Sequence, residues 1–480
     1  DAGDAFLSTA LRNTVVGDLS GSGITSGDNN TALGTQALQT NASGDNNTAV
    51  GYAALNVGTG SSNTAVGASA GTVVTDGVQN TLIGSKAGLA LDGGDGVVAV
   101  GFEALMTEDN NGNSVAVGRQ ALRTQNAGAE SYNVAVGNGA GYEVTTGVHN
   151  TIIGGVAGDA LKTGEANVVI GYNAGGVGDN WSRCVAIGRA ALGNHNPSGT
   201  TSTVTANTAV GYDALTTCNT GTNNTAIGYQ AGQDLQGGEN NVFVGLQSGN
   251  NVVSGDFNTS VGVYSLQGVC GDGNTAIGNY AMHVNTGINN TALGVMAGSN
   301  ATSGNGGIFI GKDAGVTGAP GGNITNSQNV AVFGDENISV CHIQTDWTVA
   351  SDQRDKTDFT ALDVGLDFVK ALAPVTYKWD KRSKYGDKTA DDYDLAAQTP
   401  DGTHKEDWLD IGFKAQDVQA LEEAAGYTTA AKKNLTVSTS GDGKQMGIQY
   451  SKFIPILAKA IQEQNALIEA LTARVATLEG

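Results

Sequence analysis

The stretch NTAVG at Asn47–Gly51, with AL following at Ala54–Leu55, decides the fold. Variants of this unit, ending in Ala-Leu or Ala-Gly, recur 19 times when they are aligned on the glycine of the first half. Most steps are 17 residues, a few are 16, one is 19 and two are 23. The aligned glycines are Gly17, Gly34, Gly51, Gly67, Gly84, Gly101, Gly118, Gly137, Gly154, Gly171, Gly188, Gly211, Gly228, Gly245, Gly262, Gly278, Gly294, Gly311 and Gly334. Such a period predicts a solenoid of stacked units.

Each unit reads as one coil of that solenoid. A short run such as Thr48-Ala49-Val50 places alternate side chains on opposite faces, and Gly51 permits a tight corner with positive φ. One unit cannot bury its own apolar face, so neighbouring units stack strand on strand about 4.8 Å apart. The sequence therefore predicts a mainly β fold, a parallel β-roll or β-helix shaft over residues 13–340 after a lead-in at 1–12, roughly 90 Å long at that spacing.

The asparagine that opens most units has two readings. In-register stacking would align these side chains in a ladder whose amides bond along the axis, and asparagine is also a turn residue. Both readings make it structural. The two long steps indicate loop insertions around His195–Ala206 and Gly318–Ser327.

The amino-acid composition argues against several classes of function. The formal net charge of −22 argues against binding to nucleic acid or to an anionic membrane surface. No metal or other cofactor is expected: the five histidines are scattered, and Asp109–Asn113 lacks the closing glutamate of a calcium loop. The four cysteines, Cys184, Cys218, Cys270 and Cys341, match no zinc spacing and are expected to be buried thiols.

The composition changes near Val340, where charged and aromatic residues replace the glycine-rich repeats. Helical spacing over 362–372 ends before Pro374, a strand is predicted at 375–379, and a strand and a helix follow in LDIGFKAQDVQALEEA. The sequence therefore predicts a small α+β domain at 341–450. The chain starts at Asp1 with neither an initiator Met nor a secretory signal, so we expect a fragment or a processed product, with any upstream attachment domain outside this sequence.

A heptad run occupies 451–480. Apolar residues alternate at steps of three and four, with Gln464 as a polar d position that favours one register; the seam is Ile454, Leu457, Ile461, Gln464, Ile468, Leu471, Val475 and Leu478. Ile at a with Leu at d usually favours dimers. A trimer is nevertheless expected, on the resemblance that follows.

The repeats resemble the parallel β-roll heads of trimeric autotransporter adhesins and, more closely, the shafts of bacteriophage tail fibres. Four elements within about residues 345–480 resemble, in order, the intramolecular chaperone domain of phage tail spikes and fibres, a self-cleaving serine peptidase family. These elements are Ser351-Asp352-x-Arg354-x-Lys356, Leu372-x-Pro374-Val375-x-Tyr377-x-Trp379, Gly412-Phe413-x-Ala415-Gln416-Asp417-Val418 and Tyr450-x-x-Phe453-Ile454-Pro455-Ile456-Leu457. Asp417 stands where the family has Glu, and Lys414 where it has Ile.

The resemblance implies a function. It implies a homotrimeric viral tail fibre that attaches to a host receptor, either a glycan or an outer-membrane protein. Such a fibre assembles in the host cytoplasm and joins upstream tail proteins in the virion. It also implies one self-cleavage, between Ser351 and Asp352, with Ser351 as nucleophile, Lys356 as base and Arg354 in support. The alternative for Ser351-Asp352 is a plain turn or helix N-cap, with Lys356 in solvent.

Two other functions stay open at this point. A depolymerase tail spike would need two carboxylates about 5 to 10 Å apart, and release of glycan from host envelopes would reveal it. A cellular trimeric adhesin would be expected to end in a membrane anchor, whereas this sequence ends in a polar heptad helix. The inserted loops near Asn194–Thr205 and Thr317–Asn326 are the expected receptor contacts.

Overall fold

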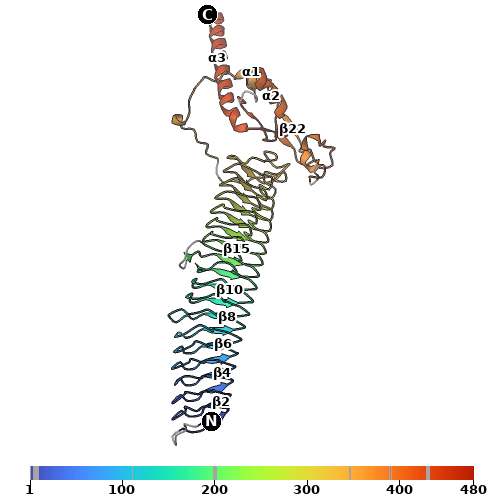
Figure 1. Ribbon diagram of the computed structural model, residues 1–480. Coiled ribbons are helices and arrows are strands. Elements are labelled where there is room, and N and C mark those ends of the chain that lie inside the picture. The colour runs from blue at the N-terminus through green and yellow to red at the C-terminus, as the bar shows by residue number, and fades with distance from the viewer. Residues whose placement is uncertain are drawn as a thin grey trace. The chain divides into compact units, whose positions relative to one another are not determined.

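The computed structural model describes residues 2–3, 10–110, 112–197, 203–344, 347–388, 390, 392–428 and 433–480 (Figure 1). Asn111 of the rejected calcium loop and part of the first inserted loop lie outside the described residues. The chain forms two compact units. The shaft unit comprises Asp1–Met296, Thr302–Gly307 and Ser327–Asn329, and the C-terminal unit comprises Ala297–Ala301, Ile308–Asn326 and Val330–Gly480.

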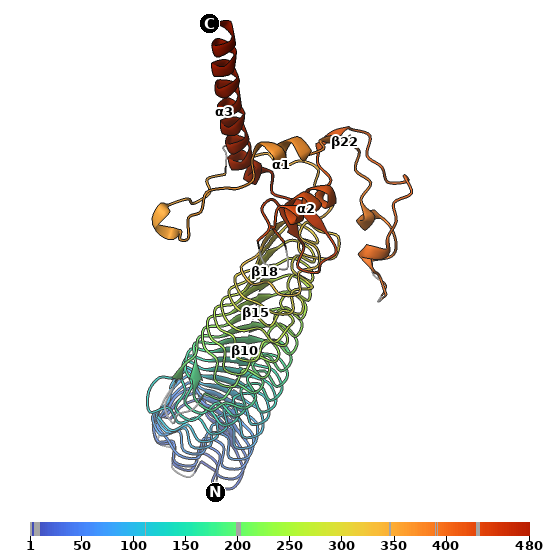
Figure 2. The same cartoon turned by 90° about the horizontal axis from the view of Figure 1, so that it is seen from above.

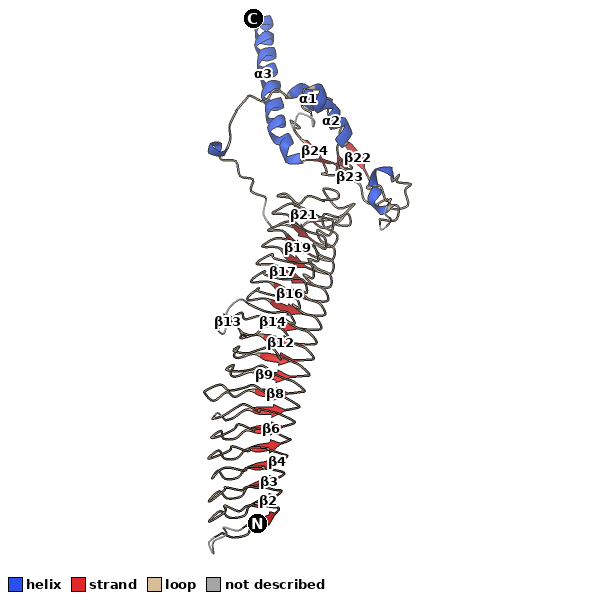
Figure 3. Cartoon of the chain, in the orientation of Figure 1, coloured by secondary structure: helices blue, strands red, loops and turns tan. Residues whose placement is uncertain are grey.

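The shaft unit is a parallel β-solenoid of 17 coils, each with one three-residue strand. The strands form one column along the solenoid (Figure 3), and the coils lie behind one another when the shaft is viewed from above (Figure 2). Their bounds are β1 Thr14–Val16, β2 Thr31–Leu33, β3 Thr48–Val50, β4 Thr64–Val66, β5 Thr81–Ile83, β6 Val98–Val100, β7 Val115–Val117, β8 Val134–Val136, β9 Thr151–Ile153, β10 Val168–Ile170, β12 Val185–Ile187, β14 Thr208–Val210, β15 Thr225–Ile227, β16 Val242–Val244, β17 Thr259–Val261, β18 Thr275–Ile277 and β19 Thr291–Leu293. The predicted fold class is confirmed.

Register is kept through every change of step. Thr48, Ala49 and Val50 pair with Thr64, Ala65 and Val66 across a 16-residue step. The 23-residue step pairs Val185 with Thr208 in the same way. The inserted residues carry β13 (Thr203–Val204), which pairs with β11 (Trp181–Ser182) of the preceding coil. Insertions therefore leave the coil as loops, and the strand column continues.

A glycine corner follows each strand, as predicted. Gly51 has φ +134°, and a Cβ at this position would lie 2.5 Å from the carbonyl oxygen of Gly67 in the next coil. Both the dihedral angle and the close approach of two backbones exclude a side chain. The repeat thus fixes glycine here by geometry.

One large aliphatic side chain fills each typical coil, from one of two positions. Leu55, four residues after its corner glycine, is buried in one coil, and Gly58 stands three residues later. In the next coil Gly71 takes the first position and Val74 is buried at the second. The left-handed backbone at Leu55 (φ 44°) costs about 1 kcal/mol, less than the roughly 1.5–3 kcal/mol that burial of its side chain contributes.

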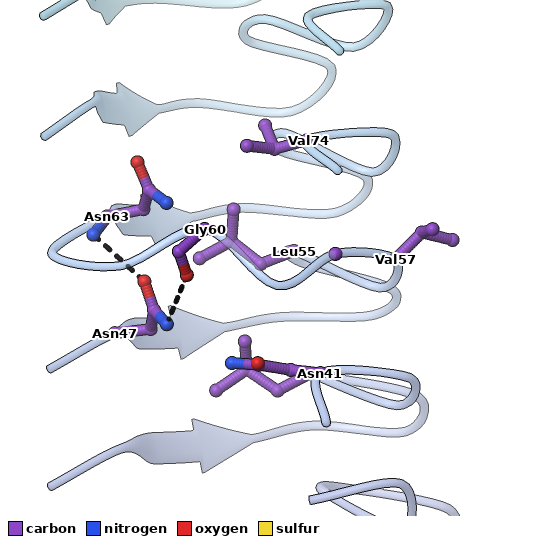
Figure 4. Close-up of a pocket in the computed structure, with 9 residues that line it drawn as sticks. Asn41, Asn47, Leu55, Val57, Gly60, Asn63 and Val74 are labelled. Carbon is purple, nitrogen blue, oxygen red and sulfur yellow. Dashed lines mark hydrogen bonds between the residues drawn. The ribbon is translucent and has the colours of Figure 1, made fainter. Parts of the chain in front are cut away.

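The asparagine ladder is present and buried. Asn47 Oδ1 accepts from the backbone N–H of Asn63 at 2.9 Å, and its Nδ2 donates to the carbonyl of Gly60 at 2.9 Å (Figure 4). The side chain therefore bonds chiefly to the backbone of the next coil. The cavity beside it is about 10 Å³, no more than one water molecule needs, so this part of the interior offers no space for a ligand.

The C-terminal unit begins with two further coil strands and continues as a small α+β domain. Strands β20 and β21 pair in parallel, and β22 with β23 and β24 with β25 pair antiparallel. The elements are β20 Ile308–Ile310, β21 Ala331–Phe333, η1 Gln353–Asp355, α1 Leu366–Ala371, β22 Val375–Tyr377, η2 Arg382–Lys384, η3 Leu395–Ala397, β23 Asp410–Gly412, α2 Ala415–Ala424, β24 Val437–Thr439, β25 Met446–Ile448, η4 Tyr450–Lys452 and α3 Phe453–Glu479. All 19 aligned glycines thus follow a strand.

Three sequence predictions need correction. The first helix begins at Leu366, and Leu362 instead packs beside the domain core from the preceding segment. Three cysteines are buried thiols, but Cys341 is exposed because it lies in a solvent-facing run after β21. The expected strand at 375–379 ends at Tyr377.

Candidate functional site

Three of the four motifs meet in one small core. Val364, Phe368, Val418, Val437, Phe453 and Ile456 form that core. Val375 pairs with Gly412 across β22 and β23, and Phe413 lies 5.4 Å from Phe453 between ring centroids. The motif residues therefore hold the domain together: they join β22, α2 and α3 instead of lining an active site.

Asp410 and Tyr450 make hydrogen bonds to residues of these motifs. Asp410 Oδ2 accepts from Trp379 Nε1 at 3.2 Å and from the Tyr377 hydroxyl at 3.4 Å. The Tyr450 hydroxyl accepts from the backbone N–H of Phe413 at 3.3 Å. The sequence analysis named the aromatic residues but not Asp410, because its partners lie more than 30 residues earlier.

Two glutamates tie helices to their neighbours, and neither was found from the sequence. Buried Glu422 in α2 accepts at Oε1 from the N–H and hydroxyl of Thr436, at 2.7 and 2.6 Å. Glu463 in α3 accepts at Oε2 from the backbone N–H of Leu366, the first residue of α1, at 2.7 Å. A carboxylate at a helix N-terminus is favourable because the first N–H groups have no partner within the helix.

Ser351 and Lys356 lie together in an exposed segment before the core. Lys356 Nζ is 2.5 Å from Ser351 Oγ and 3.3 Å from the carbonyl oxygen of Ser351. Residues 353–355 form the 3₁₀ turn η1, which folds Lys356 back over Ser351. The amine therefore reaches both the hydroxyl and the carbonyl of the Ser351–Asp352 peptide bond.

Asp352 and Arg354 hold the turn between them. Asp352 Oδ1 accepts from the Arg354 backbone N–H at 2.9 Å and caps η1, and Oδ2 accepts from a terminal guanidinium nitrogen at 2.6 Å. These hydrogen bonds lower the pKa of the Asp352 carboxyl below its ordinary value. Arg354 contacts Asp352, whereas Lys356 contacts Ser351, so the N-cap geometry and the Ser-Lys contact coexist. The assignment of catalytic roles stays a prediction.

Positive side chains of the domain also bind the segment after β21. Lys381 Nζ donates to the carbonyl of Glu336 at 2.7 Å, Lys388 pairs with the Glu336 carboxylate, and Lys384 donates to Asn337. These contacts place η2 against residues 336–337 within the C-terminal unit. The segment that leads to Ser351 is thus tied to the domain at its start.

Helix α3 presents two different faces. Phe453, Ile456 and Ala460 are buried in the domain core, whereas the residues of the predicted seam are exposed. The seam residue Ile461, for example, is 64% exposed and Leu471 is 61% exposed. The seam is thus a long apolar row on the exposed side of α3.

A buried polar cluster in the shaft was also missed by the sequence analysis. His195 Nε2 lies 2.9 Å from Thr205 Oγ1, which lies 3.0 Å from Cys184 Sγ, and His195 Nδ1 lies 2.9 Å from the carbonyl of Cys218. Burial lowers the pKa of His195 to about 4. A carbonyl only accepts, so the neutral ring donates from Nδ1 and accepts at Nε2. The cluster joins the two ends of the first insertion, His195 and Thr205.

The described residues contain no group of three or more His, Cys, Asp or Glu side chains placed to hold a metal ion. Among the helices in this part of the chain, none combines the length and the apolar character that crossing a membrane requires.

The comparisons concern the C-terminal unit. Residues 351–427, from Ser351 through α2, match the family model described as the chaperone of endosialidase. No curated protein and no solved structure matches the chain. Residues 351–427 thus form a chaperone-of-endosialidase domain behind a parallel β-solenoid, an arrangement that fits a tail spike or tail fibre.

Proposed function

We propose that this chain is the distal part of a homotrimeric bacteriophage tail fibre for host attachment, assembled by a C-terminal chaperone that then cleaves itself off. The observation that carries the proposal is the order of the parts. A chaperone-of-endosialidase match starts at Ser351, directly behind a repetitive solenoid and ahead of a helix with an uncovered apolar seam. The Ser-Lys contact lies at the first residue of the match.

The chaperone solves a register problem. Strands of nearly identical coils could pair one coil out of register at little cost, because register is weakly specified in repetitive, glycine-rich strands. Three copies joined first at α3 bring the shafts to a common starting point and raise their effective concentration. The shafts then assemble from that end. Removal of the chaperone leaves a fibre that is held by its unfolding barrier.

The cleavage chemistry requires more than one copy. Attack by Ser351 Oγ on its own carbonyl carbon would close a four-membered ring, so we assign the attack to the Ser351–Asp352 bond of a neighbouring copy. The Oγ–C bond forms and the C–N bond breaks. Lys356 takes the hydroxyl proton and passes it to the amine of Asp352, and water then hydrolyses the ester.

Assembly would also favour the neutral form of the Lys356 amine, which the base role requires. A lysine acts as a base only when neutral, and removal from water favours the neutral form. Ser351 and Lys356 are exposed in the single chain, so packing of three chains would supply the missing burial. Cleavage would then report completed assembly. In the virion, one end of the fibre joins upstream tail proteins. The fibre contacts a receptor on the host cell surface.

Intact-mass analysis of the denatured wild-type protein tests the proposal. We expect two fragments that meet at Ser351/Asp352, and a single intact chain for Ser351→Ala. Ser383→Ala, in η2 and away from the Ser-Lys contact, is the control and should cleave like the wild type. An intact wild-type chain after assembly would refute self-cleavage and leave α3 as a permanent oligomerisation helix.

A further inference from the structure

The outer face of the strand column in the shaft unit carries only uncharged β-formers. In each of its 17 coil strands the middle residue points inward, and the first and third point outward. Every third residue is Val, Ile or Leu, and every first residue is Thr or Val. The chain as a whole has a net charge of −22, yet none of these 34 outward positions is charged. We call the third-position residues the aliphatic stripe.

The aliphatic stripe is continuous from coil to coil and partly exposed to solvent. Parallel pairing places Val50 directly opposite Val66, and Val66 opposite Ile83, so successive side chains stand one strand spacing apart. Val66 is 37% exposed, Ile83 38% and Leu293 48%. Ten of the 17 stripe residues are exposed and seven are half-buried. At a strand spacing of about 4.8 Å the row is about 80 Å long, and so continuous an apolar surface is typical of a protein–protein interface.

We propose that the aliphatic stripe is the surface along which copies of this shaft pack against one another. A partner that covers it over 17 coils must present apolar groups at the same strand spacing, and a second copy of the same solenoid does so. The stripe itself carries no charge, so acidic copies that meet there bring no like charges of the strand column together. This inference rests on the proposed trimer and names the face that forms it.

The proposed interface also determines which parts of each coil remain on the outside of the fibre. The corners and loops of the shaft unit, which carry its charged side chains and the first insertion, face outward around the fibre. Receptor contacts would then be made from these loops, whereas the strand column lies at the centre. Substitutions on the stripe should affect assembly, and those on the loops should affect attachment.

Cysteine cross-linking tests the assignment with matched pairs in the same coils. In a Cys341→Ser background, which removes the exposed native thiol, we would introduce Val66→Cys or Ile277→Cys on the stripe. The controls are Val73→Cys and Val284→Cys, seven residues further along the same coils and outside the strand column. Val73 and Val284 are 40% and 37% exposed, against 37% and 38% for Val66 and Ile277.

A short bis-maleimide should join chains through the stripe thiols at least fivefold more than through the control thiols, read on denaturing gels. Native mass is measured on the same samples. A trimer in which the stripe thiols cross-link no more than the controls would overturn the interface and leave the proposed trimer standing. A monomeric wild-type mass would overturn both.

Discussion

Lys356 Nζ lies 2.5 Å from Ser351 Oγ and 3.3 Å from the carbonyl oxygen of the same residue. One amine thus reaches the candidate nucleophile and the bond proposed for cleavage. Five residues of sequence separation suffice because η1 turns the chain between them. Structure and family match coincide here, since the match starts at Ser351.

Lys356→Arg should abolish cleavage while it keeps the positive charge. Arginine cannot give up its proton at accessible pH and so cannot act as the base. We expect the cleavage rate to fall by about 10²-fold or more, measured by the appearance of fragments over time on denaturing gels. Lys370→Arg, at an exposed site on α1, is the control. Cleavage of Lys356→Arg at the wild-type rate would exclude the base role.

Leu471→Asp should prevent self-association of α3. It places a charge in the apolar seam, whereas Thr472→Asp adds the same charge one residue later and off the seam. Because the proposed cleavage needs neighbouring copies, Leu471→Asp should also remain uncleaved, and Thr472→Asp should cleave. Light scattering after size-exclusion chromatography and intact mass measure the two effects. Efficient cleavage of a monomeric Leu471→Asp chain would show that one chain suffices.

Gly51→Ala should destabilise the shaft far more than Gly128→Ala. Both glycines have positive φ, at +134° and +65°, but only the Cβ at position 51 would meet backbone, the carbonyl of Gly67 at 2.5 Å. We expect about 1 kcal/mol for Gly128→Ala from the dihedral angle alone, and at least twice that loss for Gly51→Ala. Thermal unfolding of the two variants compares them. Equal losses would mean that the coils adjust their spacing.

His195 should make the shaft acid-sensitive. Its folded pKa of about 4 lies below the ordinary 6.5, so the stability that the neutral ring contributes is complete above pH 6.5 and is lost as the pH falls to 4. The loss is on the order of 3 kcal/mol. Unfolding of wild type and His195→Gln at pH 7 and pH 4 measures it, because the difference between the two proteins removes the contribution of the carboxylates. A parallel pH dependence in both would contradict the assignment.

The shaft fold was predictable because each repeat unit contains the residues that define its own strand and turns. The alternation around Ala49, the corner at Gly51 and the ladder at Asn47 are local signals, and their repetition defines the stack. Successive coils bury either Leu55 or Val74, and the sequence shows only the first of these two positions, as Ala-Leu or Ala-Gly. The second position, that of Val74, is set by the volume inside the closed coil and so could not be predicted from one unit.

The remaining features depend on contacts between distant residues. Cys184, His195 and Thr205 come from one insertion and its neighbouring coils, and their sequence spacing matches no known motif. Glu463 lies next to Gln464 in the heptad run, and its spacing gave no sign that its carboxylate accepts a hydrogen bond from the first residue of α1. Cys341 was expected to be buried from its residue type, but the segment after β21 lies in solvent. In contrast, Ser351 and Lys356 were found because their spacing is short and belongs to a family motif.

Native mass spectrometry of the purified wild-type product tests the central claim most directly. The account predicts one complex of three copies of residues 1–351, without residues 352–480. A single intact chain of residues 1–480 would contradict both the trimer and the removable chaperone.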